Sequence, residues 1–158
     1  MNKRIHIVFW AFLTAVILTA CGEDSELARF KKSIDDFCTR ISEIDSSINQ
    51  IDAQSDDATA QLLANLDDLD SAFRHFAQLD FPQEFDYLEN LADESSEYMT
   101  EAVKSYHDAY GGESYDENTA EYAKQNYSRA YKRIQIIISF LHGEEPTDAD
   151  LSIEYGTE

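Results

Sequence analysis

The stretch that decides the fold is SELARFKKSIDDFCTRISEIDSSINQI, residues 25–51. Its apolar residues recur in alternating steps of three and four, with mostly charged or small polar residues between them. The apolar positions are Leu27, Phe30, Ile34, Phe37, Ile41, Ile44, Ile48 and Ile51. This spacing places a continuous apolar seam along one side of a helix, so the sequence predicts a long amphipathic helix over residues 26–52.

Three more helices are expected downstream, because apolar residues keep a similar spacing in three later stretches. They cover residues 56–79, 82–110 and 115–142. The seam of the helix at 82–110 is rich in small residues, which would let a neighbouring helix approach closely. These small residues include Ala92, Ser95, Ala102 and Ala109.

Local signals place the boundaries of these helices. Ser55 is expected to be the N-cap of the second helix, and Pro82 is expected in the first turn of the third. Ser114 and Glu117 have the spacing of a capping box for the fourth helix, which is expected to end at Gly143.

The short connections favour an all-α fold, an antiparallel up-down-up-down four-helix bundle over residues 27–143. A monomer is expected because every helix has a seam to bury. Two alternatives stay open: a longer three-helix arrangement, and an intermolecular coiled coil formed by residues 26–52. Residues 144–158 form an acidic C-terminal tail that either lies along the bundle or is disordered.

The first residues of the chain have the layout of a secretory signal peptide. Lys3 and Arg4 precede an apolar run from Ile5 to Leu18, which is short for a transmembrane helix. The run ends in Leu18-Thr19-Ala20-Cys21, which resembles the lipobox of bacterial lipoproteins. The alternatives are an ordinary secretory signal with a chance cysteine and an uncleaved signal anchor.

The resemblance implies that residues 1–20 are a signal peptide and that Leu18, Thr19 and Ala20 are recognised by the lipoprotein signal peptidase. Cys21 would then receive a diacylglyceryl group and become the first residue of the mature chain. Residues 21–26 would be the lipidated cysteine and a short spacer. The protein would be held by lipid on the extracytoplasmic face of the cell membrane.

The mature chain is strongly acidic. The signal peptide holds two of the 12 Lys and Arg and none of the 32 Asp and Glu, so ten basic against 32 acidic residues give a mature charge of about −22. This charge argues against nucleic acid as a partner and against lying flat on anionic lipid. With Cys21 lipidated, Cys38 is expected to be a half-buried thiol with no cysteine of its own chain to pair with.

The motifs of common helical enzymes are missing from the sequence. A di-iron bundle needs Glu three residues before His, but Ala72, Lys104 and Ser139 stand before His75, His107 and His142. Haem-attachment and zinc-helix motifs are also missing. We therefore expect no enzymatic activity, no cofactor and no bound metal. His75 and His107 are expected to be solvated, and His142 to lie at a helix end.

Two kinds of surface residue remain as candidate contacts. Acidic stripes on the second and third helices are expected to be solvated faces, although a cation could bridge them. Tyr122 and Tyr131 lie beside the seam and could form an exposed aromatic strip suited to a cationic partner. The preferred hypothesis is a lipid-anchored helical lipoprotein that acts by contact with a protein of the cell envelope. The alternative is a ligand- or cation-binding lipoprotein that uses the acidic stripes or a gap beside the small residues.

Overall fold

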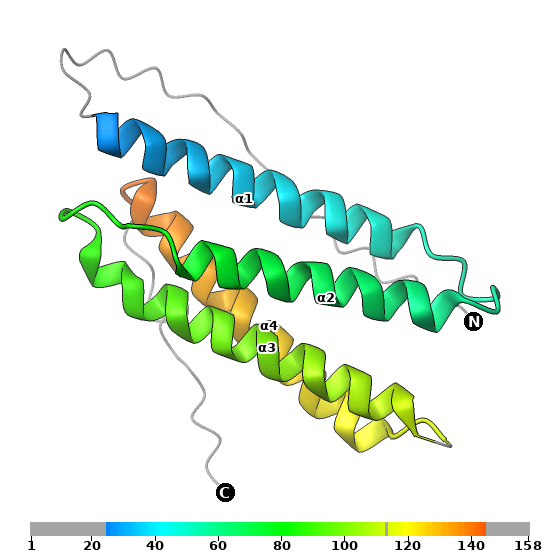
Figure 1. Ribbon diagram of the computed structural model, residues 1–158. Coiled ribbons are helices and arrows are strands. Elements are labelled where there is room, and N and C mark those ends of the chain that lie inside the picture. The colour runs from blue at the N-terminus through cyan, green and yellow to red at the C-terminus, as the bar shows by residue number, and fades with distance from the viewer. Residues whose placement is uncertain (1–24, 113, 145–158) are drawn as a thin grey trace, which may run out of the picture.

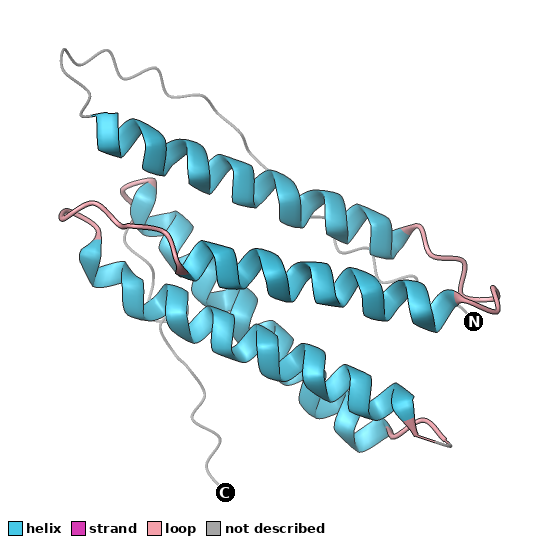
Figure 2. Ribbon diagram, viewed as in Figure 1, coloured by secondary structure: helices cyan, strands magenta, loops and turns pink. Residues whose placement is uncertain are grey.

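The computed structural model describes residues 25–112 and 114–144 of the chain. These residues form four α-helices and one short 3-10 helix, and no β-strand occurs among them (Figure 2). The elements are α1 (Ser25–Asn49), α2 (Ala58–Ala77), η1 (Asp86–Leu88), α3 (Glu89–Gly111) and α4 (Glu117–Leu141). The prediction of an all-α fold is confirmed. Within the same residues, none of the helices is long and apolar enough to cross a membrane.

The chain turns back at each connection between helices (Figure 1). As a result, the start of α1, the connection between α2 and α3 and the end of α4 lie at one end of the structure. We call this the proximal end, because it contains Ser25. The α1–α2 connection and the turn between α3 and α4 lie at the opposite end, the distal end.

Aromatic rings fill the core between α1 and the rest of the structure. The Phe37 ring lies 4.4 Å from the Phe76 ring and 5.5 Å from the Phe73 ring, centroid to centroid. Not all of the α1 seam is covered, however: Phe30, Phe37, Ile41 and Ile44 are buried, whereas the other four positions are half-buried. The seam of α1 is therefore the least completely covered part of the predicted core.

Small side chains line the contact between α3 and α4. Ala92, Ala102, Ala109, Ala123 and Ala130 have no exposed surface. These two helices form the most extensive contact between elements of the structure, and the contact between α1 and α2 is the smallest of those between successive helices. The close approach expected from the small residues of the third helix is thus realised with α4.

The third helix begins later than the sequence suggested. Residues 82–88 form a turn and then η1, and α3 starts at Glu89 rather than in a first turn containing Pro82. Phe81 and Pro82 are buried, and the Phe81 ring lies 4.9 Å from that of Phe30. Because this connection packs over the proximal end, residues 82–88 do not continue α3 towards its N-terminus.

Both predicted N-caps are also wrong: an aspartate nearer the helix stands at each N-cap position, although only that of α4 makes a side-chain cap hydrogen bond. Asp57 precedes α2 and accepts a hydrogen bond from the Ser55 hydroxyl. At α4, the Asp116 carboxylate accepts hydrogen bonds from the backbone N–H groups of Asn118 and Thr119, at 3.0 and 3.2 Å.

The helix ends differ from the expected ones by only a few residues, as fraying ends commonly do. The first helix ends at Asn49, the second at Ala77, the third at Gly111 and the fourth at Leu141. At the end of α4, Gly143 has a φ of 73°, a conformation that glycine adopts without steric cost. This is the glycine that the sequence placed at the end of the fourth helix.

Candidate interaction surface

Four tyrosines lie within about two helical turns of the connection that joins α3 to α4, at the distal end. We call Tyr106, Tyr110, Tyr115 and Tyr122 the tip cluster. The rings of Tyr110 and Tyr115 lie 5.1 Å apart, and the Asp116 N–H closes the turn by donating to the Ala109 carbonyl at 3.0 Å. Tyr115 and Tyr122 are 56% and 47% exposed, so the tip cluster presents aromatic surface to solvent.

The tip cluster is graded from half-buried to exposed. Burial raises the pKa of Tyr106, and the neighbouring Tyr110, Tyr115 and Glu121 raise it further. The pKa of Tyr110 is raised by burial and then by Tyr115. These hydroxyls stay protonated at neutral pH, so they can donate hydrogen bonds to a partner.

Carboxylates beside the tip cluster form ion pairs with the two neighbouring lysines. Lys104 pairs with Asp108 at 2.8 Å, and Lys124 pairs with Glu121 at 3.4 Å. The hydrogen bond to Asp108, and then its charge, raise the pKa of Lys104. Exposed aromatic rings among carboxylates suit a partner that carries basic side chains.

A second pair of tyrosines lies inside the structure, where α4 faces α1. The hydroxyls of Tyr127 and Tyr131 donate to the same Asp45 oxygen, at 3.4 and 3.1 Å. Their rings stack at 4.7 Å, and the Tyr131 ring also lies 5.4 Å from that of Phe73. The expected exposed strip is therefore half right: Tyr122 is exposed, whereas Tyr131 is half-buried and bonded to α1.

Burial of Asp45 makes this contact sensitive to protonation. Desolvation raises the pKa of the Asp45 carboxyl, and the hydrogen bonds from Tyr131 and Tyr127 oppose that rise. Desolvation likewise raises the pKa of Tyr127 and of Tyr131. The two phenols are thus neutral donors over the physiological range, and the carboxylate is the group that titrates.

Other polar contacts join α3 to its neighbours. The Arg133 guanidinium donates to Glu94 at 2.5 Å and lies over the Tyr98 ring, 4.3 Å from its centroid. On the other side, Asp70 accepts from the Thr100 hydroxyl at 2.6 Å and pairs with Arg74 at 2.6 Å. These groups hold helices together, and they use carboxylates that the sequence had placed on solvated stripes.

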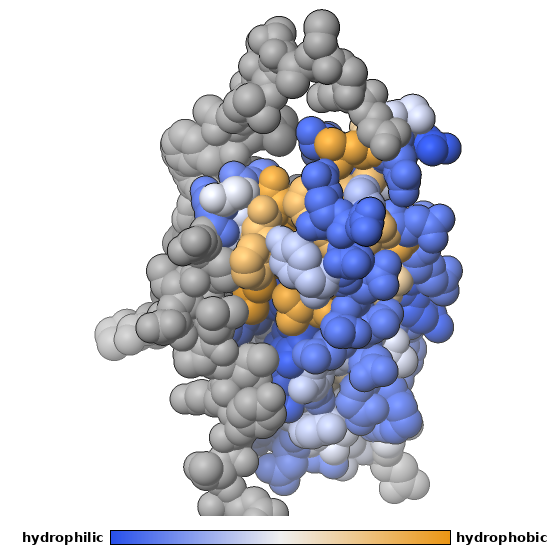
Figure 3. Space-filling model, turned by 90° about the vertical axis from the view of Figure 1, so that its left-hand side faces the viewer, coloured by the Kyte–Doolittle hydropathy of each residue, from blue (hydrophilic) through white to orange (hydrophobic). Residues whose placement is uncertain are grey.

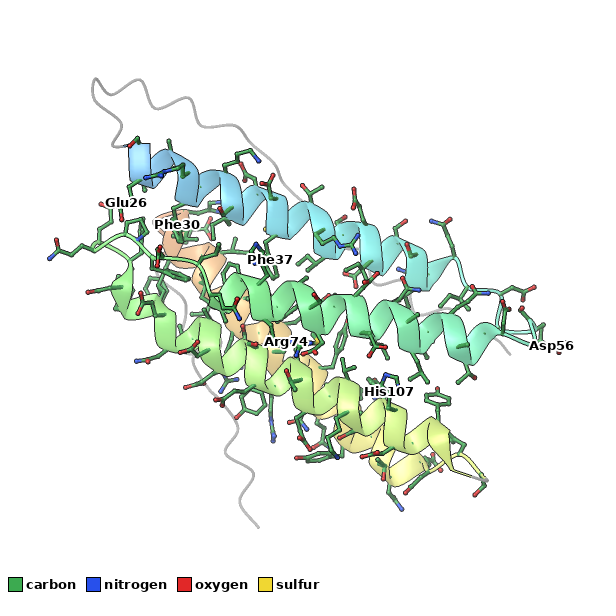
Figure 4. The ribbon with its side chains drawn as sticks, viewed as in Figure 1. Glu26, Phe30, Phe37, Asp56, Arg74 and His107 are labelled. Atoms are coloured by element: carbon green, nitrogen blue, oxygen red, sulfur yellow. The ribbon has the colours of Figure 1, made fainter. Side chains whose placement is uncertain are left out.

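The three histidines in the described part of the chain lie near the surface. His75 and His107 are exposed, as expected, and His107 also contacts Asp67 at 2.8 Å across α2 and α3. His142 caps α4, with its backbone N–H donating to the Ile138 carbonyl. Figure 4 shows His107 on α3 and Arg74 on α2.

The acidic stripes and the small residues of α3 were the other candidate contacts. No group of three His, Cys, Asp or Glu side chains there is arranged to hold a metal ion. Ala92, Ser95 and Ala102 have no exposed surface.

The residues that resemble a lipobox, Leu18, Thr19, Ala20 and Cys21, lie outside the residues that the structure describes. Cys38 lies on α1 and is half-buried, as expected. Burial raises the pKa of its thiol, and Asp35 raises it further. A thiol with a raised pKa is a poor nucleophile at neutral pH.

Comparisons of the chain with protein-family models, with curated proteins and with solved structures find no match.

Proposed function

We propose that this chain is a lipid-anchored lipoprotein that acts by protein contact at the extracytoplasmic face of a bacterial cell membrane. The observation that carries the proposal is the order of basic start, apolar run and Leu18-Thr19-Ala20-Cys21. In this proposal residues 1–20 are removed and Cys21 carries the lipid. One acyl chain anchors a protein only marginally, but the two chains of a diacylglyceryl group anchor it stably.

The mature domain in this proposal is an up-down-up-down four-helix bundle that works as a monomer. Contacts between each successive pair of helices support this arrangement. So do the hydrogen bonds from Tyr127 and Tyr131 to Asp45, which join the fourth helix to the first. When no tension acts on it, the bundle would hold its surfaces at set distances from the anchor.

The tip cluster is the surface that we assign to the protein partner. The 25 residues of α4 span about 37 Å at 1.5 Å per residue, so the turn beside the tip cluster lies about that far from the proximal end. It would project away from the membrane, where an envelope protein can reach it. Tyrosine is enriched in protein interfaces, and the surrounding carboxylates favour a partner with exposed Lys or Arg.

Metabolic labelling with an alkyne fatty acid tests the anchor. The wild-type protein and the Cys38→Ala variant should both incorporate the label, because Cys38 is not the lipidated residue. The Cys21→Ala variant should not incorporate it and should be released or remain as the uncleaved precursor. Equal labelling of all three proteins would refute the lipoprotein assignment.

Cross-linking in intact cells, followed by mass spectrometry, tests the contact surface. We expect a defined partner with the wild-type protein and its loss in the double variant Tyr115→Ala, Tyr122→Ala. Gln135→Ala is the control, since Gln135 is exposed on α4 and lies outside the tip cluster. Recovery of neighbours in proportion to their abundance, or equal loss of the partner in the control, would contradict the assignment of the tip cluster.

A further inference from the structure

The proximal end carries an exposed apolar patch, visible in the view onto that end (Figure 3). We call Phe85, Tyr87, Phe140 and Leu141 the proximal patch. The rings of Tyr87 and Phe140 meet edge to face at 5.7 Å, and Tyr87 is 54% exposed. Phe85, Phe140 and Leu141 are each partly exposed, so apolar surface from two separate segments meets here.

Contacts with α1 fix this patch beside the start of the first helix. The Phe85 ring stacks on the Phe30 ring at 5.9 Å, and Phe30 lies in the second turn of α1. Figure 4 shows Glu26 and Phe30 at the proximal end and Asp56 at the distal end. The patch and the beginning of α1 therefore belong to the same end face.

The distance to the proposed anchor is short. Only three residues lie between Cys21 and Ser25, which is four steps along the chain. A fully extended chain spans at most about 3.6 Å per residue, so Ser25 lies within about 14 Å of the lipidated residue. The proximal end is thereby held at the membrane surface, whatever path the spacer takes.

We propose that the proximal patch docks into the interfacial layer of the membrane and seats the bundle end-on. The proposal rests on the lipid anchor of the proposed function. The side chains of the proximal patch suit the interfacial layer, because Phe and Leu can bury apolar surface at the headgroup boundary. Tyr87 brings an apolar ring with a polar hydroxyl, a combination that is enriched at membrane interfaces.

Charges around the patch define the lipid that it prefers. Glu84, Asp86 and Glu89 lie in and beside η1, and Glu144 follows α4. Basic residues at this end lie on α1 and include Arg29, Lys31 and Lys32. The carboxylates adjoin the patch in sequence, so docking favours a zwitterionic surface and weakens on an anionic one, more so at low salt.

Tryptophan fluorescence tests the docking directly. The single tryptophan of the chain is Trp10, within the signal peptide, so the proposed mature protein contains none. The Phe140→Trp variant of the lipidated mature protein would be placed in phosphatidylcholine vesicles, with and without brominated phosphatidylcholine. The matched control is Tyr115→Trp, which puts the same probe in the tip cluster. A second proximal variant, Tyr87→Trp, serves if the first does not fold.

We expect blue-shifted emission and loss of most of the fluorescence in brominated vesicles for the proximal variant. The Tyr115→Trp control should keep its emission, and added phosphatidylglycerol should reduce the proximal quenching. Unquenched proximal emission, or equal quenching of both variants, would overturn end-on docking.

Vesicle flotation separates this proposal from the one on which it rests. If the protein floats with the vesicles but the proximal probe is not quenched, the anchor stands and the docking is refuted. If the mature protein does not float, the lipid anchor itself is refuted, and docking through it is refuted too.

Discussion

The ion pair between Glu94 and Arg133 gives a test in which the two partners behave differently. The side chain of Arg133 is only 4% exposed, whereas that of Glu94 is 48% exposed. Removing Glu94 leaves a buried cation without its carboxylate, but removing Arg133 leaves an anion that water already reaches. We therefore expect Glu94→Ala to destabilise the protein more than Arg133→Met.

The size of each loss in unfolding free energy depends on the contacts that the remaining partner keeps. Breaking a fully buried ion pair from one side costs about 3–5 kcal/mol. Here the guanidinium keeps its place over Tyr98 and a 3.3 Å hydrogen bond to the Arg129 carbonyl, so the cost of Glu94→Ala falls to about 2 kcal/mol. Methionine retains the apolar stem of Arg133, and we expect the Arg133→Met variant to lose less than about 1 kcal/mol.

Urea denaturation followed by circular dichroism measures both changes. The double variant should be about as stable as Arg133→Met alone, because Glu94 no longer has a buried cation to neutralise. This corresponds to a coupling of about 2 kcal/mol in a double-mutant cycle. A larger loss for Arg133→Met than for Glu94→Ala, or additive losses, would show that the reasoning about the buried cation is wrong.

Three further predictions concern the polar contact with α1, the α3–α4 contact and the cap of α4. The raised pKa of Asp45 means that the protonated form is favoured in the folded state, so the protein should gain stability as pH falls through that pKa. Melting curves from pH 7 to pH 4 should show a smaller gain for Asp45→Asn, and an unchanged gain would contradict the assignment. Ala130→Leu should lower the free energy of unfolding in urea by about 1–3 kcal/mol, because it overpacks the α3–α4 contact. The control Ala64→Leu, on the exposed face of α2, should leave it almost unchanged. Similar losses for the two variants would count against close packing of α3 and α4. Asp116→Ala should lower the melting temperature, and Ser114→Ala should not. A loss for Ser114→Ala alone would show that Ser114, and not Asp116, caps α4.

The four helices could be predicted from the sequence because each buries one side. Along α1, Phe37, Ile41 and Ile44 recur at the spacing of a helical seam and are buried together. Small residues likewise signalled the close α3–α4 contact. A seam gives the existence and face of a helix, but it does not say which other helix covers it.

The start of α3 could not be predicted by local signals. Pro82 suits a first helical turn, yet it lies in a connection whose neighbour Phe81 packs against Phe30. That contact joins residues far apart in the chain, so it overrides the local preference. The caps failed for a smaller reason, since Ser55 and Ser114 each stand two residues before an aspartate that takes the cap position.

The contact of Asp45 with Tyr127 and Tyr131 was missed because its partners lie at opposite ends of the chain. One signal was present: Asp45 follows Ile44 at the edge of the seam, where a carboxylate becomes partly desolvated. Tyr127 and Tyr131 are spaced one helical turn apart, which places both hydroxyls on one side. Their hydrogen bonds to Asp45 depend on how α1 and α4 face each other, and no local sequence pattern predicts that arrangement.

The modest contact between α1 and α2 has a mechanical consequence. In the proposed lipoprotein, any pull between the membrane and a bound partner enters the domain through the start of α1. This helix has the least covered seam, and it would be the first to peel away under tension. The extensive contact between α3 and α4 would still hold. The tip cluster would therefore keep its shape while α1 separated from the other helices and unfolded. The first helix would then work as an extensible link between the anchor and the surface that it presents.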